Sequence, residues 1–169
     1  GLGKNVGFLL DGGPCESGLE STIIDCTGQK ACLLRPGGIT REAVATTLAK
    51  AGLDPTIKIA EPLDDKTKPI APGQLTSHYA PRATLRVEAE AWQQGEEMIG
   101  FGKIHGAGKL RLNLSPSGNL IEAAANLFSM LHAADATSTE KIAIAPIPDT
   151  GLGEAINDRL HRAAAPRPD

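Results

Sequence analysis

Two hydroxyl side chains and one guanidinium are the groups in this sequence best suited to bind a phosphate. Ser21 and Thr22 open an apolar run that ends at Asp25, directly after a glycine-rich segment. Arg35 closes a second apolar run and is followed by Pro-Gly-Gly. Hydroxyls and free backbone N–H groups beside such turns bind phosphate oxygens, and a guanidinium makes bidentate phosphate contacts. The pattern therefore predicts a nucleotide-phosphate site at one rim of a sheet.

Each of these residues also has a purely structural interpretation. Ser21 and Thr22 could satisfy the backbone of a turn or begin a strand, because hydroxyl residues are common in both settings. Arg35 could form an ordinary ion pair on the surface. The sequence alone leaves both interpretations open.

A histidine and the single tyrosine of the chain stand side by side in a proline-rich stretch. His78 and Tyr79 lie within residues 71–81, which begin and end near prolines. An aromatic side chain with a polar tip, carried on a stiff loop, can cover a pocket without collapsing into it. The pair is therefore a candidate lid, and the alternative is that Tyr79 only packs the loop against a domain.

The glycine-rich segment 100–109 fits neither phosphate-binding fingerprint. Gly108-Lys109 lacks the earlier glycine that a P-loop requires, and His105 stands where the dinucleotide fingerprint needs glycine. We expect a plain loop there. The cysteines and the other histidines show no spacing typical of a zinc site, so we predict no metal ligands among Cys15, Cys26, Cys32, His105, His132 and His161. We expect buried cysteines and surface histidines.

Composition excludes several classes of protein. Lys and Arg number 17 against 20 Asp and Glu, a net charge of −3, and only 3% of residues are aromatic. Such a chain has neither the general basic field nor the aromatic platforms of a nucleic-acid-binding protein. No apolar run reaches the ~18 residues of a membrane helix, and the first residues are too polar for a signal peptide. We expect a cytoplasmic protein with no membrane partner.

Short strands and one helix are expected to position the candidate phosphate site. Apolar runs predict strands over 6–10, 21–25 and 31–35, the last two joined as a hairpin. Thr40 then has the character of a helix N-cap, and Gly52 ends the helical pattern. The site residues would thus lie at the ends of neighbouring strands.

A proline-dense segment separates this part from the rest of the chain. Prolines recur from 55 to 81, at a density that forbids helices and restricts strands. We therefore predict one structured part over 1–54, an extended linker over 55–82 and a second domain over 83–169.

The second domain alternates strands and helices. Strands are expected over 83–88, 98–101, 110–114 and 141–147. Two helices are expected from the apolar faces Leu120, Ala124, Leu127, Leu131 and Leu152, Ile156, Leu160. Asn119, with Glu122 three residues later, resembles a capping box at the start of the first of these helices. This order favours an open α/β sheet with some parallel pairing. The polar triplet Asn157-Asp158-Arg159 in the last helix is interpreted as a solvated face or a contact between domains.

Six motifs in one order resemble the Sua5 type of threonylcarbamoyl-AMP synthase, in the Sua5/YciO/YrdC family. They are Asp11-Gly-Gly-Pro, Glu20-Ser-Thr-Ile-Ile-Asp25, Leu34-Arg-Pro-Gly-Gly-Ile39, Pro72-Gly with His78-Tyr-Ala-Pro81, Asn126-Leu-Phe128, and Gly151-Leu-Gly with Ala155-Ile-Asn-Asp-Arg-Leu160. The resemblance implies the C-terminal remnant of a YrdC-like α/β domain, an extended linker, and a small Rossmann-like open α/β Sua5 domain.

The resemblance also implies an activity. Members of the family convert L-threonine, bicarbonate and ATP into threonylcarbamoyl-AMP and pyrophosphate, the first step toward the t6A modification of tRNA, and Mg²⁺ is the expected cofactor. Ser21 and Thr22 would belong to the nucleotide pocket, and Arg35 would contact the AMP phosphate or ribose. His78 and Tyr79 would lie in the linker that covers the pocket. Downstream tRNA-modification proteins, and weakly tRNA itself, are the expected partners.

Two further expectations follow from the resemblance. The family's catalytic domain begins well before the residue that stands first here, so we expect these 169 residues alone to be inactive. The alternative function is a non-catalytic module whose Rossmann-like half binds a small ligand, RNA or a regulatory partner. The lack of a glycine fingerprint in 83–169 counts against a nucleotide cofactor in that half.

Overall fold

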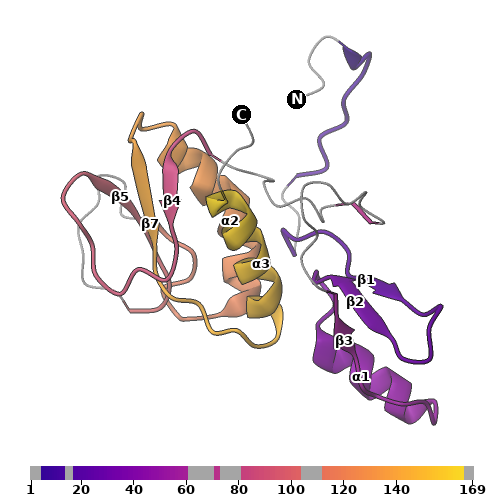
Figure 1. Cartoon of the computed structure of the whole chain (residues 1–169). Coiled ribbons are helices and arrows are strands. Elements are labelled where there is room, and N and C mark those ends of the chain that lie inside the picture. Colours follow the sequence, from indigo (N-terminus) through magenta and orange to yellow (C-terminus); the bar gives the residue numbers. More distant parts are fainter. Residues whose placement is uncertain (1–4, 14–16, 61–70, 73–80, 104–111, 166–169) are drawn as a thin grey trace.

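The computed structural model describes residues 5–13, 17–60, 71–72, 81–103 and 112–165, and two sheets organise them (Figure 1). A three-stranded sheet of order β1-β2-β3 belongs to the N-terminal part of the chain. A four-stranded sheet of order β4-β7-β5-β6 belongs to the C-terminal domain. The fold is therefore α/β, as predicted.

The N-terminal part is built on the predicted hairpin. Strands β1 (Ile23–Asp25) and β2 (Cys32–Arg35) pair antiparallel, and β3 (Lys58–Ile59) joins β2 in parallel. The Asp25 carboxylate accepts hydrogen bonds from the N–H and the hydroxyl of Thr27, at 2.8 and 2.7 Å, which closes the turn between β1 and β2. These bonds lower the pKa of Asp25. The pairing places residues 21–22 beside the end of β2.

Helix α1 (Arg41–Lys50) follows and begins at the predicted cap. The Thr40 hydroxyl accepts the N–H of Ala43 at 3.3 Å, and Gly52 ends the segment with φ 72°. No residue of α1 is buried. The helix is therefore specified by its ends more than by packing against the rest of the described chain.

The structure of this part differs from the sequence-based predictions at three points. The run 6–10 is not a strand: the chain described there has no partner strand, and Phe8, Leu9 and Leu10 are largely exposed. The predicted burial of cysteines is wrong for Cys26, which is exposed, and Cys32, which is half-buried; Cys15 lies outside the described residues. Strand β3 lies within the range predicted as linker, because the backbone of 58–60 pairs with β2 despite the nearby prolines.

The C-terminal domain is a parallel sheet with two helices along one face (Figure 1). The strands are β4 (Thr84–Arg86), β5 (Glu96–Gly100), β6 (Leu112–Asn113) and β7 (Lys141–Ile144), and every pairing between them is parallel. Helices α2 (Leu120–Asp135) and α3 (Leu152–Ala164) pack on the sheet and on each other. Among the described residues, no helix has the length and apolar character needed to cross a bilayer.

The start of each helix in this domain has a specific local cause. Asn119 Oδ1 accepts the N–H groups of Ile121 and Glu122, at 2.8 and 3.2 Å, as predicted for the cap of α2. In a capping box the Glu122 carboxylate would accept the N–H of Asn119. Here this carboxylate accepts the hydroxyl of Ser115 instead. At α3, a Cβ on Gly153 would lie 1.8 Å from the carbonyl oxygen of Pro148, so only glycine allows this entry.

Candidate functional site

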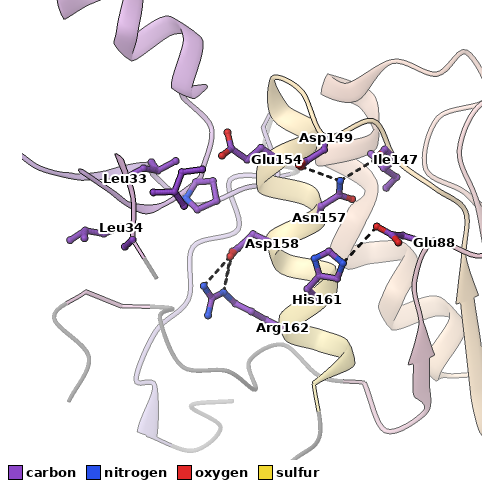
Figure 2. Close-up of a pocket in the computed structure, with 13 residues that line it drawn as sticks. Leu33, Leu34, Glu88, Ile147, Asp149, Glu154, Asn157, Asp158, His161 and Arg162 are labelled. Carbon is purple, nitrogen blue, oxygen red and sulfur yellow. Dashed lines mark hydrogen bonds and ion pairs between the residues drawn. The ribbon is translucent and has the colours of Figure 1, made fainter. Parts of the chain in front are cut away.

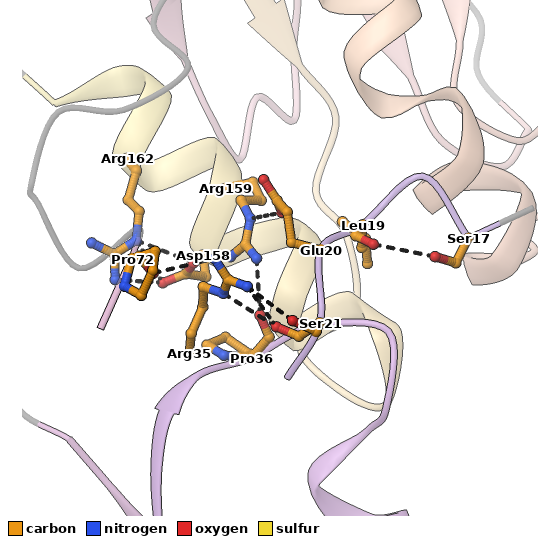
Figure 3. Close-up of polar contacts among 10 residues, drawn as sticks. All are labelled: Ser17, Leu19, Glu20, Ser21, Arg35, Pro36, Pro72, Asp158, Arg159 and Arg162. Atoms are coloured by element: carbon orange, nitrogen blue, oxygen red, sulfur yellow. Dashed lines mark hydrogen bonds and ion pairs between the residues drawn. The ribbon is translucent and has the colours of Figure 1, made fainter. Parts of the chain in front are cut away.

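Ser21 and Arg35 lie side by side where β1 begins and β2 ends (Figure 3). Arg35 is only 8% exposed. Its Nε and Nη2 donate to the backbone carbonyl of Ser21 at 3.2 and 2.9 Å, and Nη2 also reaches the Ser21 hydroxyl at 3.3 Å. Its Nη1 donates to the carbonyl of Pro72 at 3.2 Å. The structure thus brings together the two residues that the sequence placed at neighbouring strand ends.

Thr22, the third predicted residue, contacts the loop that follows Arg35. Its hydroxyl donates to the carbonyl of Ile39 at 2.5 Å and accepts the Ile39 N–H at 3.1 Å. The N–H of Gly38 donates to the carbonyl of Glu20 at 3.0 Å. The two loops are therefore joined by hydrogen bonds on both sides of Ser21. We call Ser21, Thr22 and Arg35 the strand-end cluster.

Gly37 allows these two loops to approach so closely. A Cβ at this position would lie 2.4 Å from the carbonyl oxygen of Glu20 and 2.5 Å from the backbone nitrogen of Thr22. Real Cβ atoms do not tolerate such distances from backbone, so the loops would have to separate. The glycine after Arg35-Pro36 is thus a requirement of the cluster's geometry.

A second buried arginine reaches the same place from α3. Arg159 is 1% exposed; its Nε donates to the Glu20 carboxylate at 2.8 Å and its Nη2 to the carbonyl of Pro36 at 3.0 Å. Its Nη1 pairs with Asp158, and Arg162 donates through Nε to both oxygens of Asp158. Within the triplet 157–159, Arg159 makes the predicted contact between domains, whereas the bonds of Asn157 and Asp158 stay within the C-terminal domain.

The two buried arginines differ in how their charge is balanced. Arg159 forms ion pairs with Glu20 and Asp158. Within the described parts of the chain, Arg35 bonds only to carbonyl and hydroxyl oxygens, which carry no net charge. A desolvated positive charge without a carboxylate partner favours an anion nearby. Arg35 is therefore the better candidate to bind phosphate.

A cavity of about 370 Å³ lies between the small sheet and α3 (Figure 2). Its apolar wall comes mainly from β2 and β3, and its polar wall comes mainly from the C-terminal domain. The polar lining contains four carboxylates against one guanidinium: Glu88, Asp149, Glu154, Asp158 and Arg162, together with Asn157 and His161. Such a lining repels phosphate groups, so the cavity is the poorer place for a nucleotide.

Polar contacts within the cavity wall are mostly internal to the C-terminal domain. Asn157 Nδ2 donates to the carbonyl of Ile147 at 3.1 Å and to Asp149 at 3.4 Å. His161 Nε2 lies 4.0 Å from the Glu88 carboxylate. Among the described residues, no group of three or more His, Cys, Asp or Glu is placed to bind a metal ion.

His78 and Tyr79, the candidate lid, lie outside the described residues. The strand-end cluster was predictable because its residue types bind phosphate and because they stand at the ends of predicted strands. It gave only a weak signal for Arg159, a charged residue within an amphipathic helix, and Glu20 carried no separate signal. The contact between them joins residues 139 positions apart.

The fold and the cluster define a two-part α/β protein, in which a parallel-sheet domain contacts strand ends that carry a candidate phosphate site. The family model described as the C-terminal domain of threonylcarbamoyl-AMP synthase matches residues 39–165, and the chain belongs to this family.

Known proteins resemble the chain over nearly all of its length. It is 31% identical over 182 residues to threonylcarbamoyl-AMP synthase of Bacillus subtilis, a match that covers 98% of the chain and 51% of that protein. The crystal structure of P. abyssi Sua5 complexed with L-threonine matches with a TM-score of 0.74 and 27% identity, over 91% of this chain and 48% of that one. A variant structure of the same protein, with a consecutive His-Tyr pair replaced by alanines, matches with a TM-score of 0.66 and 26% identity, over 88% and 46%. The chain spans about half the length of the curated relatives it matches.

Proposed function

We propose that this chain is the C-terminal portion of a threonylcarbamoyl-AMP synthase. The whole protein would convert L-threonine, bicarbonate and ATP into threonylcarbamoyl-AMP and pyrophosphate, as a nucleotidyltransferase acting early in t6A synthesis. Membership of the family and the relatives' names support this role. The threonine named with the P. abyssi structure supports threonine as one substrate.

The observation that carries the proposal is the buried Arg35 guanidinium beside Ser21, with no carboxylate partner in the described chain. In the proposed reaction a carbamate oxygen of threonine attacks the α-phosphorus of ATP, and the bond to the pyrophosphate oxygen breaks. Negative charge therefore gathers on the α-phosphate oxygens. A fixed guanidinium and hydroxyl donors at a low-dielectric site stabilise that charge. Ser21, Thr22 and Arg35 would supply this side of the nucleotide pocket.

The linker would complete the site by excluding water. Water would hydrolyse both the carbamate and the mixed anhydride, so closure over the pocket favours the product. His78-Tyr79 is the one His-Tyr pair of this sequence, and the relative solved with its consecutive His-Tyr pair replaced supports a role for such a pair. We propose that these two side chains lie over the strand-end cluster when substrates bind.

Mg²⁺ would accompany the nucleotide and neutralise the leaving pyrophosphate. Among the described residues, no group of three or more His, Cys, Asp or Glu side chains is placed to hold a metal ion, so the nucleotide phosphates would supply most of the ligands that do not come from the protein. A cytoplasmic location and transfer of the product to downstream tRNA-modification proteins, with weak tRNA contact, belong to the same proposal. The 169 residues alone would be inactive.

The test compares Arg35→Gln with Arg82→Gln in the whole protein. Arg82 is an exposed arginine at the end of the linker range; it pairs with Asp135 of α2 and bonds to no residue of the strand-end cluster in the described structure. The assay is threonine- and bicarbonate-dependent release of pyrophosphate from ATP. We expect Arg35→Gln to lose about 100-fold in rate, as for a lost charge-stabilising donor, and Arg82→Gln to resemble wild type. A wild-type protein that makes no product, or an active Arg35→Gln variant, contradicts the proposal.

The alternative, a ligand-binding regulatory module, makes the opposite prediction for nucleotide binding. Calorimetry of residues 83–169 with ATP separates the two. Tight binding by this domain alone would favour the regulatory module, since the domain lacks the strand-end cluster. No binding by the domain is the result that our proposal expects.

A further inference from the structure

Helix α3 contacts the strand-end cluster through the residues next to it in the sequence. Glu20 precedes Ser21, Pro36 follows Arg35, and Arg159 bonds to both at once (Figure 3). We propose that Arg159 is a positioning residue, which fixes the separation of Ser21 and Arg35 through these two neighbours. The proposal rests on the proposed function, and it gives the C-terminal domain a structural role in nucleotide binding.

Burial makes this contact demanding. Arg159 is 1% exposed, and its three donor nitrogens have partners on both strand-end loops and on its own helix. Removing the guanidinium would remove its bonds to the Glu20 carboxylate and to the Pro36 carbonyl, so both loops would lose these contacts with α3 and rearrange. The rearrangement would fall on Glu20 and Pro36, and therefore on Ser21 and Arg35.

The segment before Glu20 is also fixed to the C-terminal domain. Gly18 has φ 58°, and a Cβ there would lie 2.3 Å from the carbonyl oxygen of Ala124 in α2. Leu19 packs against the core of that domain. One side of the cluster is thus attached to α2 and α3 through 18–20, and the Arg159–Pro36 bond links the other side to the same helix.

Arg159 would act through these contacts and not by touching the nucleotide, because its charge is already balanced by two carboxylates. Arg41–Glu154 is the matched comparison. It also joins the N-terminal part to α3, at 3.2 Å, but in the described structure neither residue bonds to Glu20 or Pro36, the neighbours through which Arg159 reaches the cluster. Loss of this pair would disturb the contact between the N-terminal part and α3 without disturbing Ser21 and Arg35 directly.

The first experiment measures KM for ATP and kcat in the whole protein, for Arg159→Gln, Arg159→Lys and Arg41→Gln. We expect Arg159→Gln to raise KM about tenfold or more, with a smaller change in kcat. Lysine keeps the charge but has a single donor nitrogen, so partial rescue is expected. Arg41→Gln should stay within about twofold of wild type. An Arg159→Gln variant with wild-type KM, or equal losses for Arg159→Gln and Arg41→Gln, overturns the inference.

The second experiment needs no activity, and it separates failure of this inference from failure of the proposed function. The Gly38 N–H bonds to Glu20 and the Ile39 N–H bonds to Thr22, so amide exchange at 38 and 39 reports the spacing of the two loops. In the 169-residue chain we expect Arg159→Gln to speed exchange there about tenfold or more, with core amides of β7 unchanged. Unchanged exchange at 38 and 39 overturns the positioning role even if the enzyme is active.

A wild-type protein without activity would overturn the proposed function and leave the exchange test valid. If Arg159→Gln does not fold, Glu20→Gln is used in both experiments. It removes the charge of the same pair from its more exposed side. The outcomes named for Arg159→Gln then support or overturn the inference in the same way.

Discussion

The C-terminal domain and the N-terminal part differ in what stabilises them. Fifteen buried apolar residues form one cluster in the C-terminal domain, where Ile99, Leu127, Ile142 and Ile156 have no exposed surface. In the described residues up to 60, Leu33 is the one buried hydrophobic side chain, and Arg35 is buried with it. The first region is stabilised mainly by apolar burial, and the second mainly by strand pairing, caps and contacts with α2 and α3.

This difference places the candidate site on the less packed region. The large hydrophobic residues that remain exposed in the described chain lie almost entirely in the N-terminal part, among them Phe8, Leu9, Leu10, Ile39, Leu53 and Ile59. Local stability varies across a structure, and regions with few buried contacts open more easily. A rigid domain beside the strand-end cluster would thus compensate for the small core around it.

The largest expected effect is the loss of a core side chain from the C-terminal domain. Leu127→Ala should reduce the free energy of unfolding by about 2–5 kcal/mol, because Leu127 is fully buried and its removal leaves a cavity. Leu48→Ala in α1, where the leucine is only half-buried, should cost less than about 1 kcal/mol. Urea unfolding of both variants measures this contrast. Equal losses would mean that the two regions share one core, against the comparison above.

The next effect should appear in the site without a matching loss in the domain. Gly37→Ala places a Cβ against the backbone of Glu20 and Thr22, whereas a Cβ on Gly38 would meet only the Ser17 side chain, at 3.6 Å. We expect Gly37→Ala to lower the rate of threonylcarbamoyl-AMP formation by the whole protein about tenfold or more, because the added methyl group forces the two loops apart at a cost of about 1–3 kcal/mol. Gly38→Ala should be nearly neutral. Thermal unfolding of the C-terminal domain should change little in either variant, and a large drop in its Tm would contradict a local effect.

The features predicted correctly from the sequence are those set by neighbouring residues. The hairpin of β1 and β2, the caps Thr40 and Asn119, and the apolar faces of α2 and α3 depend on short-range patterns, and the structure confirms them. The parallel sheet followed from the alternation of strands and helices.

The features missed depend on partners far along the chain. Residues 6–10 have the composition of a buried strand but lack a partner in the described structure, and β3 forms because β2 offers a free edge. In the site, the meeting of Ser21 and Arg35 followed from the hairpin. The contact of Arg159 with Glu20 did not, because nothing in local sequence specifies which surface faces α3.

The two helix caps test the comparison at a smaller scale. Asn119→Ala removes the acceptor of two N–H bonds at the start of α2 and should cost about 1 kcal/mol of global stability, because α2 packs on the core. Thr40→Ala removes the corresponding bond at α1. Since α1 has no buried residue, we expect faster amide exchange in its first turn and little change in global unfolding. A global loss as large as that of Asn119→Ala would show that α1 is part of the cooperative core.

The smallest effect concerns the loss of folding stability at acidic pH. Arg86 donates to both oxygens of the Glu96 carboxylate, at 2.8 and 2.6 Å, and these bonds hold the pKa of Glu96 below its usual value. A group whose pKa is lowered on folding stabilises the protein above its unfolded pKa, and this contribution disappears as pH falls through the folded value. Stability of the C-terminal domain should therefore fall below about pH 5, and Glu96→Gln should be less stable at neutral pH but show a shallower decline. Asp135, whose pKa is also lowered, would leave part of the slope.

Asp54 provides the contrasting case in the N-terminal part. Its pKa is lowered by hydrogen bonds from Thr56 and by Lys30, but it is exposed and is not part of the buried apolar cluster of the C-terminal domain. Asp54→Asn should therefore leave the fall in the free energy of global unfolding at acidic pH unchanged, although it removes a carboxylate with a lowered pKa. Denaturant unfolding of the three proteins between pH 3 and 7 (about the range over which carboxylates titrate) makes the comparison. If Asp54→Asn reduced the loss of stability at acidic pH as much as Glu96→Gln, the N-terminal part would unfold together with the C-terminal domain. The candidate site would then not lie in a separately stabilised region.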